Sequence, residues 1–192
     1  MNGIVFLDRD GTLIEDVGYL SDPGKLRALP GAFEATARLS REGLVIAVVS
    51  NQAGLARGKF GEAEFRAVHR AFVGLFRERG IRFDAVEYCP HHPDGTLARY
   101  RSACECRKPG TGMAEKILAR LGIPAAWPRY MVGDKMVDIV MGKRLGARTI
   151  LVETGYGREE RRAGERDGIH PDAVVPGIRE AADWILGAEE KE

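Results

Sequence analysis

The residues of this sequence that could do chemistry lie directly after its short apolar runs. Asp8-Arg9-Asp10-Gly11-Thr12 follows the first run, Ser50-Asn51-Gln52 follows the second, and Gly133-Asp134-Lys135 follows another, with Asp138 a few residues on. In an open parallel sheet, ligands bind outside the carboxyl ends of the strands. If the apolar runs are strands of one such sheet, three segments that carry carboxylates and a hydroxyl meet at one edge.

These side chains suit phosphoryl transfer. Asp8, Asp10 and Asp134 on one edge would repel one another unless a hard cation lay among them, and Mg²⁺ prefers such oxygen ligands. One carboxylate can act as a nucleophile that forms an aspartyl-phosphate. A second carboxylate two residues on can protonate the leaving oxygen and later deprotonate the attacking water. Ser50 can hold phosphoryl oxygens, and Lys108 can offset their charge.

Each segment also has a purely structural interpretation. Asp-x-Asp-Gly-Thr alone could form an Asx-type turn, Ser50 could cap a helix, and Asp134 could form a cap or a turn. All three segments follow apolar runs, however, and a lysine accompanies them. We therefore favour the chemical interpretation.

The elements that must position these residues alternate along the chain. Short apolar runs, several of them apolar at successive positions, indicate strands buried on both faces of a sheet. Helical patterns lie between them, which predicts an α/β fold with a doubly wound, Rossmann-like parallel sheet and helices on both faces. The predicted strands are residues 4–7, 44–49, 85–88, 130–132 and 149–152, and the predicted helices are residues 31–41, 62–79, 113–121, 136–145 and 178–186.

Three segments depart from this alternation. Residues 11–30 and 89–109 are long loops, which in a compact domain are usually functional or disordered. The charged stretch 158–167 predicts a solvated face or a mobile loop. No inserted helical cap domain is apparent, so the long loops must shape any pocket.

Composition limits the classes of partner. Twenty-nine basic and 28 acidic residues give a net charge of +1, so no broad basic field for nucleic acid or anionic lipid is expected. The longest apolar run, residues 44–49, is far shorter than a membrane span, and the N-terminus has no signal-peptide pattern. We expect a soluble, cytoplasmic protein with no nucleic-acid or membrane partner. Because no coiled coil or large apolar stripe is apparent, we expect a monomer.

The three segments and Lys108 resemble, in order, the four motifs of the haloacid dehalogenase superfamily of phosphatases. The resemblance implies that Asp8 is the nucleophile and Asp10 the general acid and base. It implies that Ser50 and Lys108 bind phosphate. It further implies a Mg²⁺ ion held by Asp8, Asp134 and the backbone carbonyl of Asp10.

The three cysteines are an odd number and cannot all pair within the chain. Cys89-Pro90-His91-His92-Pro93 and Cys104-Glu105-Cys106 offer three thiolates and an imidazole, enough for a closed, structural Zn²⁺ site. The alternative is three reduced cysteines in a surface loop. Spacing does not decide between the two histidines, whereas the family pattern favours His91. We expect zinc on Cys89, His91, Cys104 and Cys106, in a zinc loop at residues 89–108 of one domain that spans residues 1–192.

Zinc-loop members of this superfamily include phosphatases that act at position 7 of D-glycero-D-manno-heptose 1,7-bisphosphate and histidinol-phosphate phosphatases. This sequence is similar to the first kind, because the stretch after its second strand is basic and its fourth motif carries Lys135. A bisphosphate has a second anionic group, which Arg57, Lys59, Arg107 and Lys135 could bind. The resemblance further implies substrate contacts by Asp16, Val17, Gly18, Tyr19, Ser50, Asn51, Gln52, Ala53, Arg107 and Lys135.

Several alternatives stay open at this point. Histidinol phosphate is the second candidate substrate. A non-catalytic, zinc-stabilised binding module is the third interpretation, although it would be expected to have lost Asp8 or Asp10. The resemblance implies a role in making heptose precursors for lipopolysaccharide core or nucleotide-activated heptose, but the sequence does not indicate the anomer. The segment Thr154-Gly155-Tyr156-Gly157-Arg158 has no role that the sequence assigns.

Overall fold

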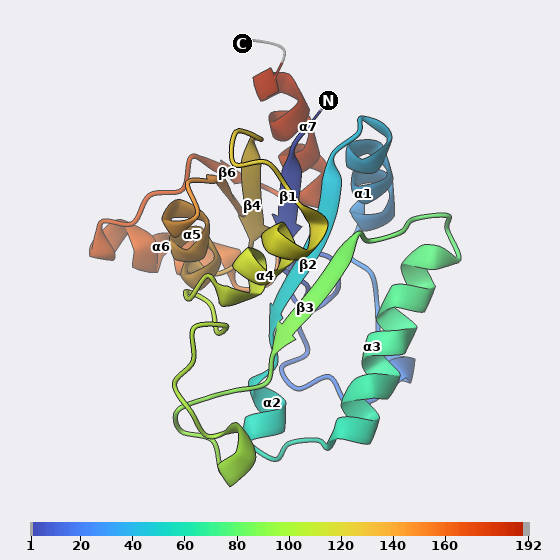
Figure 1. Cartoon of the computed structure of the whole chain (residues 1–192), viewed down its shortest axis with the longest axis vertical. Coiled ribbons are helices and arrows are strands. Elements are labelled where there is room, and N and C mark those ends of the chain that lie inside the picture. The colour runs from blue at the N-terminus through green and yellow to red at the C-terminus, as the bar shows by residue number, and fades with distance from the viewer. Residues whose placement is uncertain (1, 190–192) are drawn as a thin grey trace.

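A six-stranded parallel sheet in the order β3-β2-β1-β4-β5-β6 forms the centre of the molecule (Figure 1). The structure is a computed structural model and describes residues 2–189. The strands are β1 (Ile4–Leu7), β2 (Val45–Asn51), β3 (Ala85–Cys89), β4 (Arg129–Gly133), β5 (Arg148–Val152) and β6 (Ala173–Val175).

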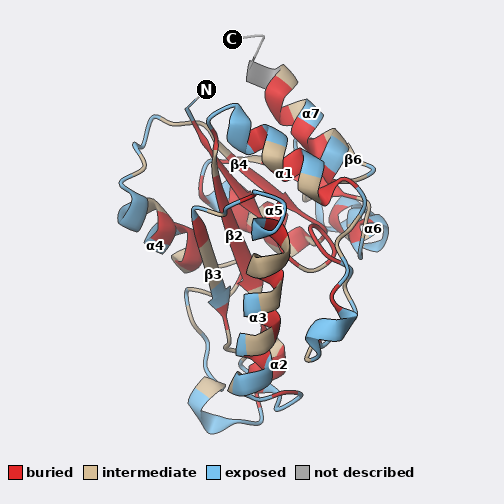
Figure 2. Cartoon of the chain, turned by 90° about the vertical axis from the view of Figure 1, so that its right-hand side faces the viewer, coloured by how far each residue is buried: buried red, intermediate tan, exposed pale blue. Residues whose placement is uncertain are grey.

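Helices cover both faces of this sheet, because the side chains of each strand alternate between the faces. Val5 and Leu7 of β1 join the cluster formed with α1, α3 and α7, whereas Ile4 and Phe6 join the cluster formed with α4 and α5. All four of these β1 side chains are fully buried, and Figure 2 shows the strands buried between the two helical layers. The helices are α1 (Ala32–Arg41), α2 (Ala53–Ala56), α3 (Glu62–Arg77), α4 (Gly112–Leu121), α5 (Met136–Arg144), α6 (Gly157–Asp167) and α7 (Ile178–Glu189), with 3-10 turns at Pro23–Lys25 and Ala98–Tyr100.

The predicted doubly wound α/β fold is confirmed, and the differences concern short or very polar segments. Strand β6 and helix α2 were not predicted, because three or four residues carry too little periodicity. The charged stretch 158–167 belongs to a regular helix, α6, in which Arg161 and Glu165 form an i,i+4 ion pair at 3.2 Å. Gly157 and Gly164 are the buried residues of that helix, so it has almost no apolar face to recognise.

The strand order places the ends of β1, β2 and β4 side by side. Leu7 pairs with Val48 of β2 and with Val132 of β4, so the residues that follow these strands emerge together. The order also reverses direction at β1, which makes this edge the topological switch point where such folds bind ligands. The long segment 89–109 projects beyond the same end of the sheet (Figure 1).

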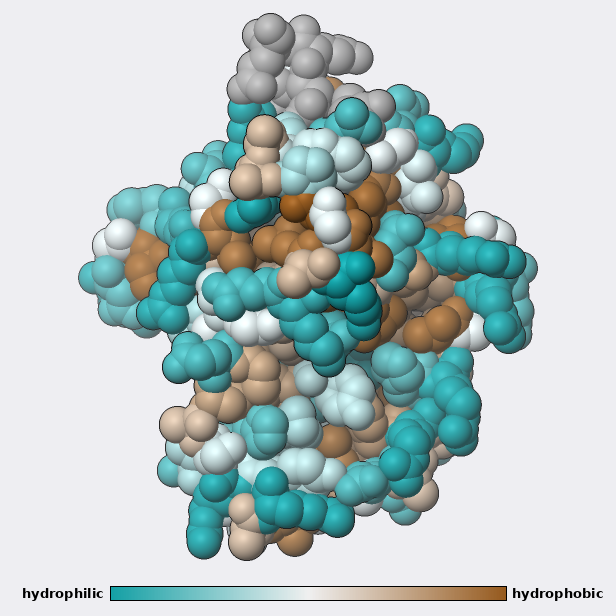
Figure 3. All heavy atoms as spheres, in the orientation of Figure 1, coloured by the Kyte–Doolittle hydropathy of each residue, from teal (hydrophilic) through white to brown (hydrophobic). Residues whose placement is uncertain are grey.

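The surface is mixed in character. In Figure 3, hydrophilic side chains cover much of the projecting loops and helix ends, and the apolar ones gather nearer the centre of the view. Within residues 2–189, none of the helices combines the length and the apolar character that crossing a membrane would need.

Candidate active site and metal centre

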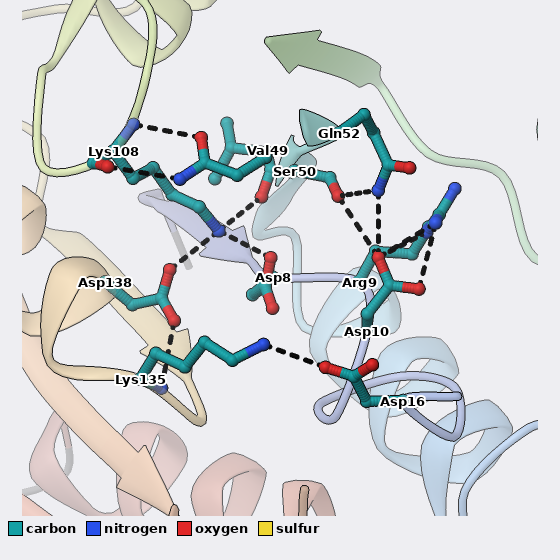
Figure 4. Close-up of polar contacts among 11 residues, drawn as sticks. Asp8, Arg9, Asp10, Asp16, Val49, Ser50, Gln52, Lys108, Lys135 and Asp138 are labelled. Carbon is teal, nitrogen blue, oxygen red and sulfur yellow. Dashed lines mark hydrogen bonds and ion pairs between the residues drawn. The ribbon is translucent and has the colours of Figure 1, made fainter. Parts of the chain in front are cut away.

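A buried lysine lies between two carboxylates at the end of β1. The Lys108 Nζ is 2.5 Å from Asp8 Oδ1 and 2.7 Å from Asp138 Oδ1, and it donates to the Val49 carbonyl at 2.9 Å (Figure 4). Lys108 reaches this place from the long loop that follows β3. Its backbone is fixed there by Asn51, whose side chain accepts from the Lys108 N–H at 3.0 Å and donates to the Lys108 carbonyl at 3.1 Å.

The electrostatics of this cluster favour a cation. Burial, with a further contribution from Asp138, raises the pKa of Asp8 to about 6 although Lys108 opposes the shift. Burial and the nearby Asp8 raise the pKa of Asp134 to about 8. Burial alone would lower the pKa of Lys108, but Asp138 and Asp8 raise it above its usual value. More negative charge is therefore buried here than Lys108 balances.

The same residues fit a hard metal ion. Oxygen atoms of Asp8, Asp134 and Asp138 lie within 4.8 Å of one another. Asp134 is fully buried, and its Oδ1 lacks a hydrogen-bond partner among the described residues. A buried, unpartnered carboxylate oxygen beside other carboxylates is the donor set that Mg²⁺ prefers. Asp138 was recognised as part of a motif but not as a site residue, although its spacing from Asp134 was the signal that could have identified it.

The Asp10 side chain points away from this cluster toward Arg9 and Gln52 (Figure 4). The Arg9 Nε donates to Asp10 Oδ2 and its Nη2 to Oδ1, both at 2.9 Å, and Gln52 Nε2 donates to Oδ2 at 2.9 Å. Gln52 also donates to Ser50 Oγ at 2.8 Å. Arg9 is only 3% exposed. Sequence reasoning missed it, because an arginine between two aspartates does not by itself indicate burial.

A small cavity opens beside Asp10. Lys135 closes one side of it, with its Nζ 2.8 Å from Asp16 Oδ2 and 4.7 Å from the centre of the Tyr156 ring. Of the residues predicted to touch substrate, Val17 is 48% exposed and is not part of the cavity lining. The lining residues are Asp10, Asp16, Gly18, Tyr19, Asn51, Gln52, Ala53, Gly54, Phe60 and Lys135.

Three of the predicted cations lie outside this lining, at or near Tyr19 and the zinc loop. The Arg57 guanidinium donates to Tyr19 Oη at 2.9 Å and contacts His92 Nε2 at 3.1 Å, and Lys59 Nζ is 5.8 Å from the centre of the Tyr19 ring. Arg107 donates to the His91 carbonyl at 3.3 Å. Burial, with further contributions from Arg107 and Arg57, lowers the pKa of His92.

The cysteine cluster has the geometry of a tetrahedral metal site. The Sγ atoms are 3.1 to 3.5 Å apart, and His91 Nδ1 lies 3.4 Å from Cys106 Sγ and 3.8 Å from Cys89 Sγ. Zn–S and Zn–N bonds imply edges of about 3.5–3.8 Å, so the two His91 distances are close to those of a zinc site and the sulfur–sulfur distances are shorter. His91 lies in the cluster, whereas His92 accepts from the Asp94 N–H and contacts Arg57. The four residues therefore fit Zn²⁺, with no position left open.

Comparisons with known proteins agree with the fold and the site. A parallel sheet whose central strands end in buried carboxylates around a lysine is typical of haloacid dehalogenase-like hydrolases, and the HAD hydrolase-like family model matches residues 105–181. The chain is 42% identical to the D-glycero-beta-D-manno-heptose-1,7-bisphosphate 7-phosphatase of Vibrio cholerae, over 95% of each chain. It also matches the corresponding Escherichia coli K12 enzyme at 35% identity, over 96% of this chain and 88% of that one.

Solved structures point the same way. The D,D-heptose 1,7-bisphosphate phosphatase from B. bronchiseptica, complexed with magnesium and phosphate, superposes with a TM-score of 0.82 at 32% identity, covering 97% of this chain and 99% of that one. The corresponding Burkholderia thailandensis structure has a TM-score of 0.68 at 32% identity, covering 96% and 98%. This chain belongs to the heptose-1,7-bisphosphate phosphatase family of haloacid dehalogenase-like hydrolases.

Proposed function

We propose that this protein is a Mg²⁺-dependent phosphatase that removes the C7 phosphate of D-glycero-D-manno-heptose 1,7-bisphosphate through a phosphorylated Asp8. The observation that carries the proposal is the Lys108 ammonium held between Asp8 and Asp138, next to the unpartnered oxygen of Asp134. A buried carboxylate beside fixed positive charge is prepared to accept a phosphoryl group.

In the first step, an Asp8 carboxylate oxygen attacks the phosphorus of the C7 phosphate, and the bond between phosphorus and the C7 oxygen breaks. The Asp10 carboxyl group donates its proton to the departing C7 oxygen, which leaves as the sugar hydroxyl. Lys108, which contacts Asp8, offsets the charge on the transferred phosphoryl group. Ser50, near the end of β2, binds the phosphoryl oxygens.

In the second step, the Asp10 carboxylate takes a proton from a water molecule that attacks the phosphorus of phosphorylated Asp8. The bond between phosphorus and the Asp8 oxygen breaks, inorganic phosphate leaves, and the Asp8 carboxylate is restored. Asp10 thus acts as acid in one step and base in the next. In support of this role, Asp10 lines one pocket together with Asp8, Ser50 and Lys108.

Mg²⁺, held by Asp8, Asp134 and the backbone carbonyl of Asp10, would neutralise the charge of the phosphoryl oxygens. The crowding of Asp8, Asp134 and Asp138 supports this assignment. Lys108 balances only part of their negative charge.

A group of cations just outside the cavity lining suits a second phosphate. We assign the contacts with the C1 phosphate to Arg57, Lys59 and Arg107, whose positive groups gather around Tyr19 and the zinc loop. Lys135, together with Asp16, Gly18, Tyr19, Asn51, Gln52 and Ala53, would contact the sugar. The names of the relatives specify the β anomer, which we propose for this chain as well.

A structural Zn²⁺ on Cys89, His91, Cys104 and Cys106 would hold the loop of residues 89–108 over the sheet, as part of one domain. Arg107 and Lys108 follow Cys106 directly. The metal would therefore fix both side chains relative to the phosphate.

The test is phosphate release from the heptose bisphosphate with and without Mg²⁺, with ³¹P NMR used to identify the remaining monophosphate. We expect Mg²⁺-dependent release of the C7 phosphate by the wild type and none by Asp8→Asn. Because Asn is nearly isosteric with Asp, the variant keeps the shape of the site while it removes the nucleophile. A matched control is Asp94→Asn, an exposed aspartate of the zinc loop, which should retain activity.

The alternative functions predict other outcomes. Faster hydrolysis of histidinol phosphate than of the bisphosphate would overturn the substrate assignment and leave the phosphatase mechanism in place. Absence of Mg²⁺-dependent release from any sugar bisphosphate would favour a binding module. Equal rates on the α and β anomers would overturn the anomer preference alone.

A further inference from the structure

We propose that the loop between β5 and α6, residues 154–157, positions the metal-binding carboxylate Asp134, and that Gly155 tunes the affinity of the site for Mg²⁺. Neither the sequence motifs nor the proposed reaction assigns a role to this loop. The inference rests on the proposed function only in that Asp134 is taken to bind Mg²⁺.

The Asp134 carboxylate lies in a slot between two glycines that are remote in sequence. A Cβ built on Gly155 would be 2.3 Å from Asp134 Oδ2 and 2.7 Å from Gly11 Cα, and a Cβ on Gly11 would be 2.2 Å from the same Oδ2. Real Cβ atoms essentially never come within 3.0 Å of such neighbours. A side chain at either position would therefore displace the carboxylate.

Hydrogen bonds connect the two walls of this slot. Thr154 Oγ1 donates to the Gly11 carbonyl at 2.6 Å, which joins the loop after β5 to the turn that follows Asp10. The backbone N–H of Tyr156 donates to Asp134 Oδ2 at 2.9 Å. One carboxylate oxygen is thereby fixed by the loop.

The other oxygen is left for the ion. Asp134 Oδ1 is buried and lacks a hydrogen-bond partner in the described part of the chain. Since the loop engages Oδ2 and leaves Oδ1 unengaged, it sets which atom faces the cation and in which direction its lone pairs point. Hydrogen bonds to a ligating carboxylate typically contribute 10- to 100-fold to metal affinity or activity.

The Tyr156 side chain has a separate role. Its ring is 45% exposed and packs beneath the Lys135 ammonium, which pairs with Asp16 on the side of the cavity. The part of Tyr156 that contacts Asp134 is its backbone N–H. Replacing the ring therefore removes the contact with Lys135 and keeps the backbone hydrogen bond to Asp134.

The chain offers a matched control for Gly155. Gly168 ends α6 with a φ of +69°, close to the +56° of Gly155, but a Cβ there would meet nothing within 4 Å. Gly168→Ala thus carries the backbone strain of a side chain at positive φ without any contact with Asp134. A difference between the two variants reports the contact with Asp134.

The experiment is calorimetric titration of Mg²⁺ alone into the zinc-loaded protein, purified in Mg²⁺-free buffer, so no catalytic turnover is required. We expect Gly155→Ala to raise the Kd for Mg²⁺ by about 10- to 100-fold, and Thr154→Val, which loses only the hydroxyl bond to Gly11, to raise it by about 3- to 10-fold. Gly168→Ala and Tyr156→Ala should bind Mg²⁺ like the wild type. Tyr156→Ala should instead raise KM for the bisphosphate.

The outcomes separate this inference from the proposed function. If the wild type binds Mg²⁺ and both Gly155→Ala and Thr154→Val bind it equally well, the positioning role is wrong and the phosphatase assignment stands. If Gly168→Ala weakens binding as much as Gly155→Ala does, backbone strain is the cause and the inference is also wrong. If the wild type itself binds no Mg²⁺, the metal role of Asp134 fails and the inference fails with it. Thr154→Val provides the test should Gly155→Ala not fold.

Discussion

Arg9 binds both carboxylate oxygens of Asp10, through its Nε and Nη2 atoms at 2.9 Å each. Gln52 is a third donor to the carboxylate and binds Oδ2, and Ser50 Oγ lies 3.4 Å from the same atom. The more crowded Oδ2 is therefore poorly placed to carry a proton, and Oδ1 is the atom from which Asp10 would donate to the leaving group. Bidentate contact with a buried guanidinium also fixes the plane of the carboxylate.

We expect Arg9→Met to impair proton donation more than phosphoryl transfer itself. Loss of an aligned general acid costs about 100-fold or more when the leaving group is a sugar alkoxide. The effect should be about tenfold or less with p-nitrophenyl phosphate, whose leaving group needs no proton. The measurement is kcat/KM on both substrates. Arg9→Lys, which keeps the charge but not the bidentate contact, should lie between Arg9→Met and the wild type, and equal losses on the two substrates would contradict this role.

The ion pairs of Lys108 predict a loss of both stability and activity in Lys108→Met. Asp8 and Asp138 would remain buried without their cation, a loss that in buried pairs costs about 3–5 kcal/mol of folding free energy. The turnover rate should fall by about 100- to 1,000-fold, because a fixed charge beside the phosphoryl group disappears. Urea denaturation and steady-state kinetics measure the two effects.

A double variant separates these two roles of Lys108. Lys108→Met combined with Asp138→Asn should regain part of the stability, because the unpaired charge of Asp138 is removed, but it should regain no activity. Recovery of activity in the double variant would show that Lys108 serves only to balance Asp138.

The central fold could be predicted because its strands are buried on both faces and so are continuously apolar. Residues 4–7 illustrate this, and Asp8 directly after them was identified by its position at a strand end. The prediction of Lys108 as a site residue had a different basis. It depended on the order of motifs in a known superfamily, because no local pattern indicates that a loop lysine will enter a buried site.

The features that could not be predicted depend on close contacts between distant segments. The burial of Arg9 follows from its contact with Asp10 at the end of β1, and nothing in its neighbours' types requires it. Gly155 approaches Asp134 through the path of a loop after β5, which no spacing rule describes. Helix α6 was missed because nearly all its side chains are solvated.

The buried charge of Asp134 predicts how the Mg²⁺-free protein depends on pH. Its pKa is raised to about 8 in the folded state, against an ordinary value of 3.8 when unfolded. Between these values the folded state binds more protons than the unfolded state, so the contribution of Asp134 to stability falls as pH rises from about 4 to about 8. Asp134→Asn has no ionisable group at this position, so its stability does not fall with pH for this reason.

In Mg²⁺-free buffer, Asp134→Asn should therefore be more stable than the wild type at pH 8, by at least about 1 kcal/mol, with a smaller difference at pH 5. Saturating Mg²⁺ should stabilise the wild type at pH 8 and leave the variant unchanged, because binding to the folded state alone adds stability. Urea denaturation at the two pH values measures both effects. If the free energies of unfolding of the two proteins changed in parallel with pH, the pKa of Asp134 would not be raised in the folded state.

The zinc loop predicts that loss of the metal will reduce stability and activity together. Cys106 Sγ lies 3.1 Å from both other thiols, so Cys106→Ala should abolish zinc retention and lower Tm by on the order of 10 °C. The backbone of Lys108 lies two residues on and is held by Asn51, so a freed loop should also lower kcat/KM by about tenfold or more. Zinc content by mass spectrometry, Tm and kcat/KM are measured on the same preparations.

The matched pair His91→Ala and His92→Ala distinguishes the ligand from its neighbour, because of the two histidines His91 is the one that lies in the cluster. His91→Ala should lose zinc and His92→Ala should keep it, whereas an active, fully stable Cys106→Ala protein would refute a structural role for the metal.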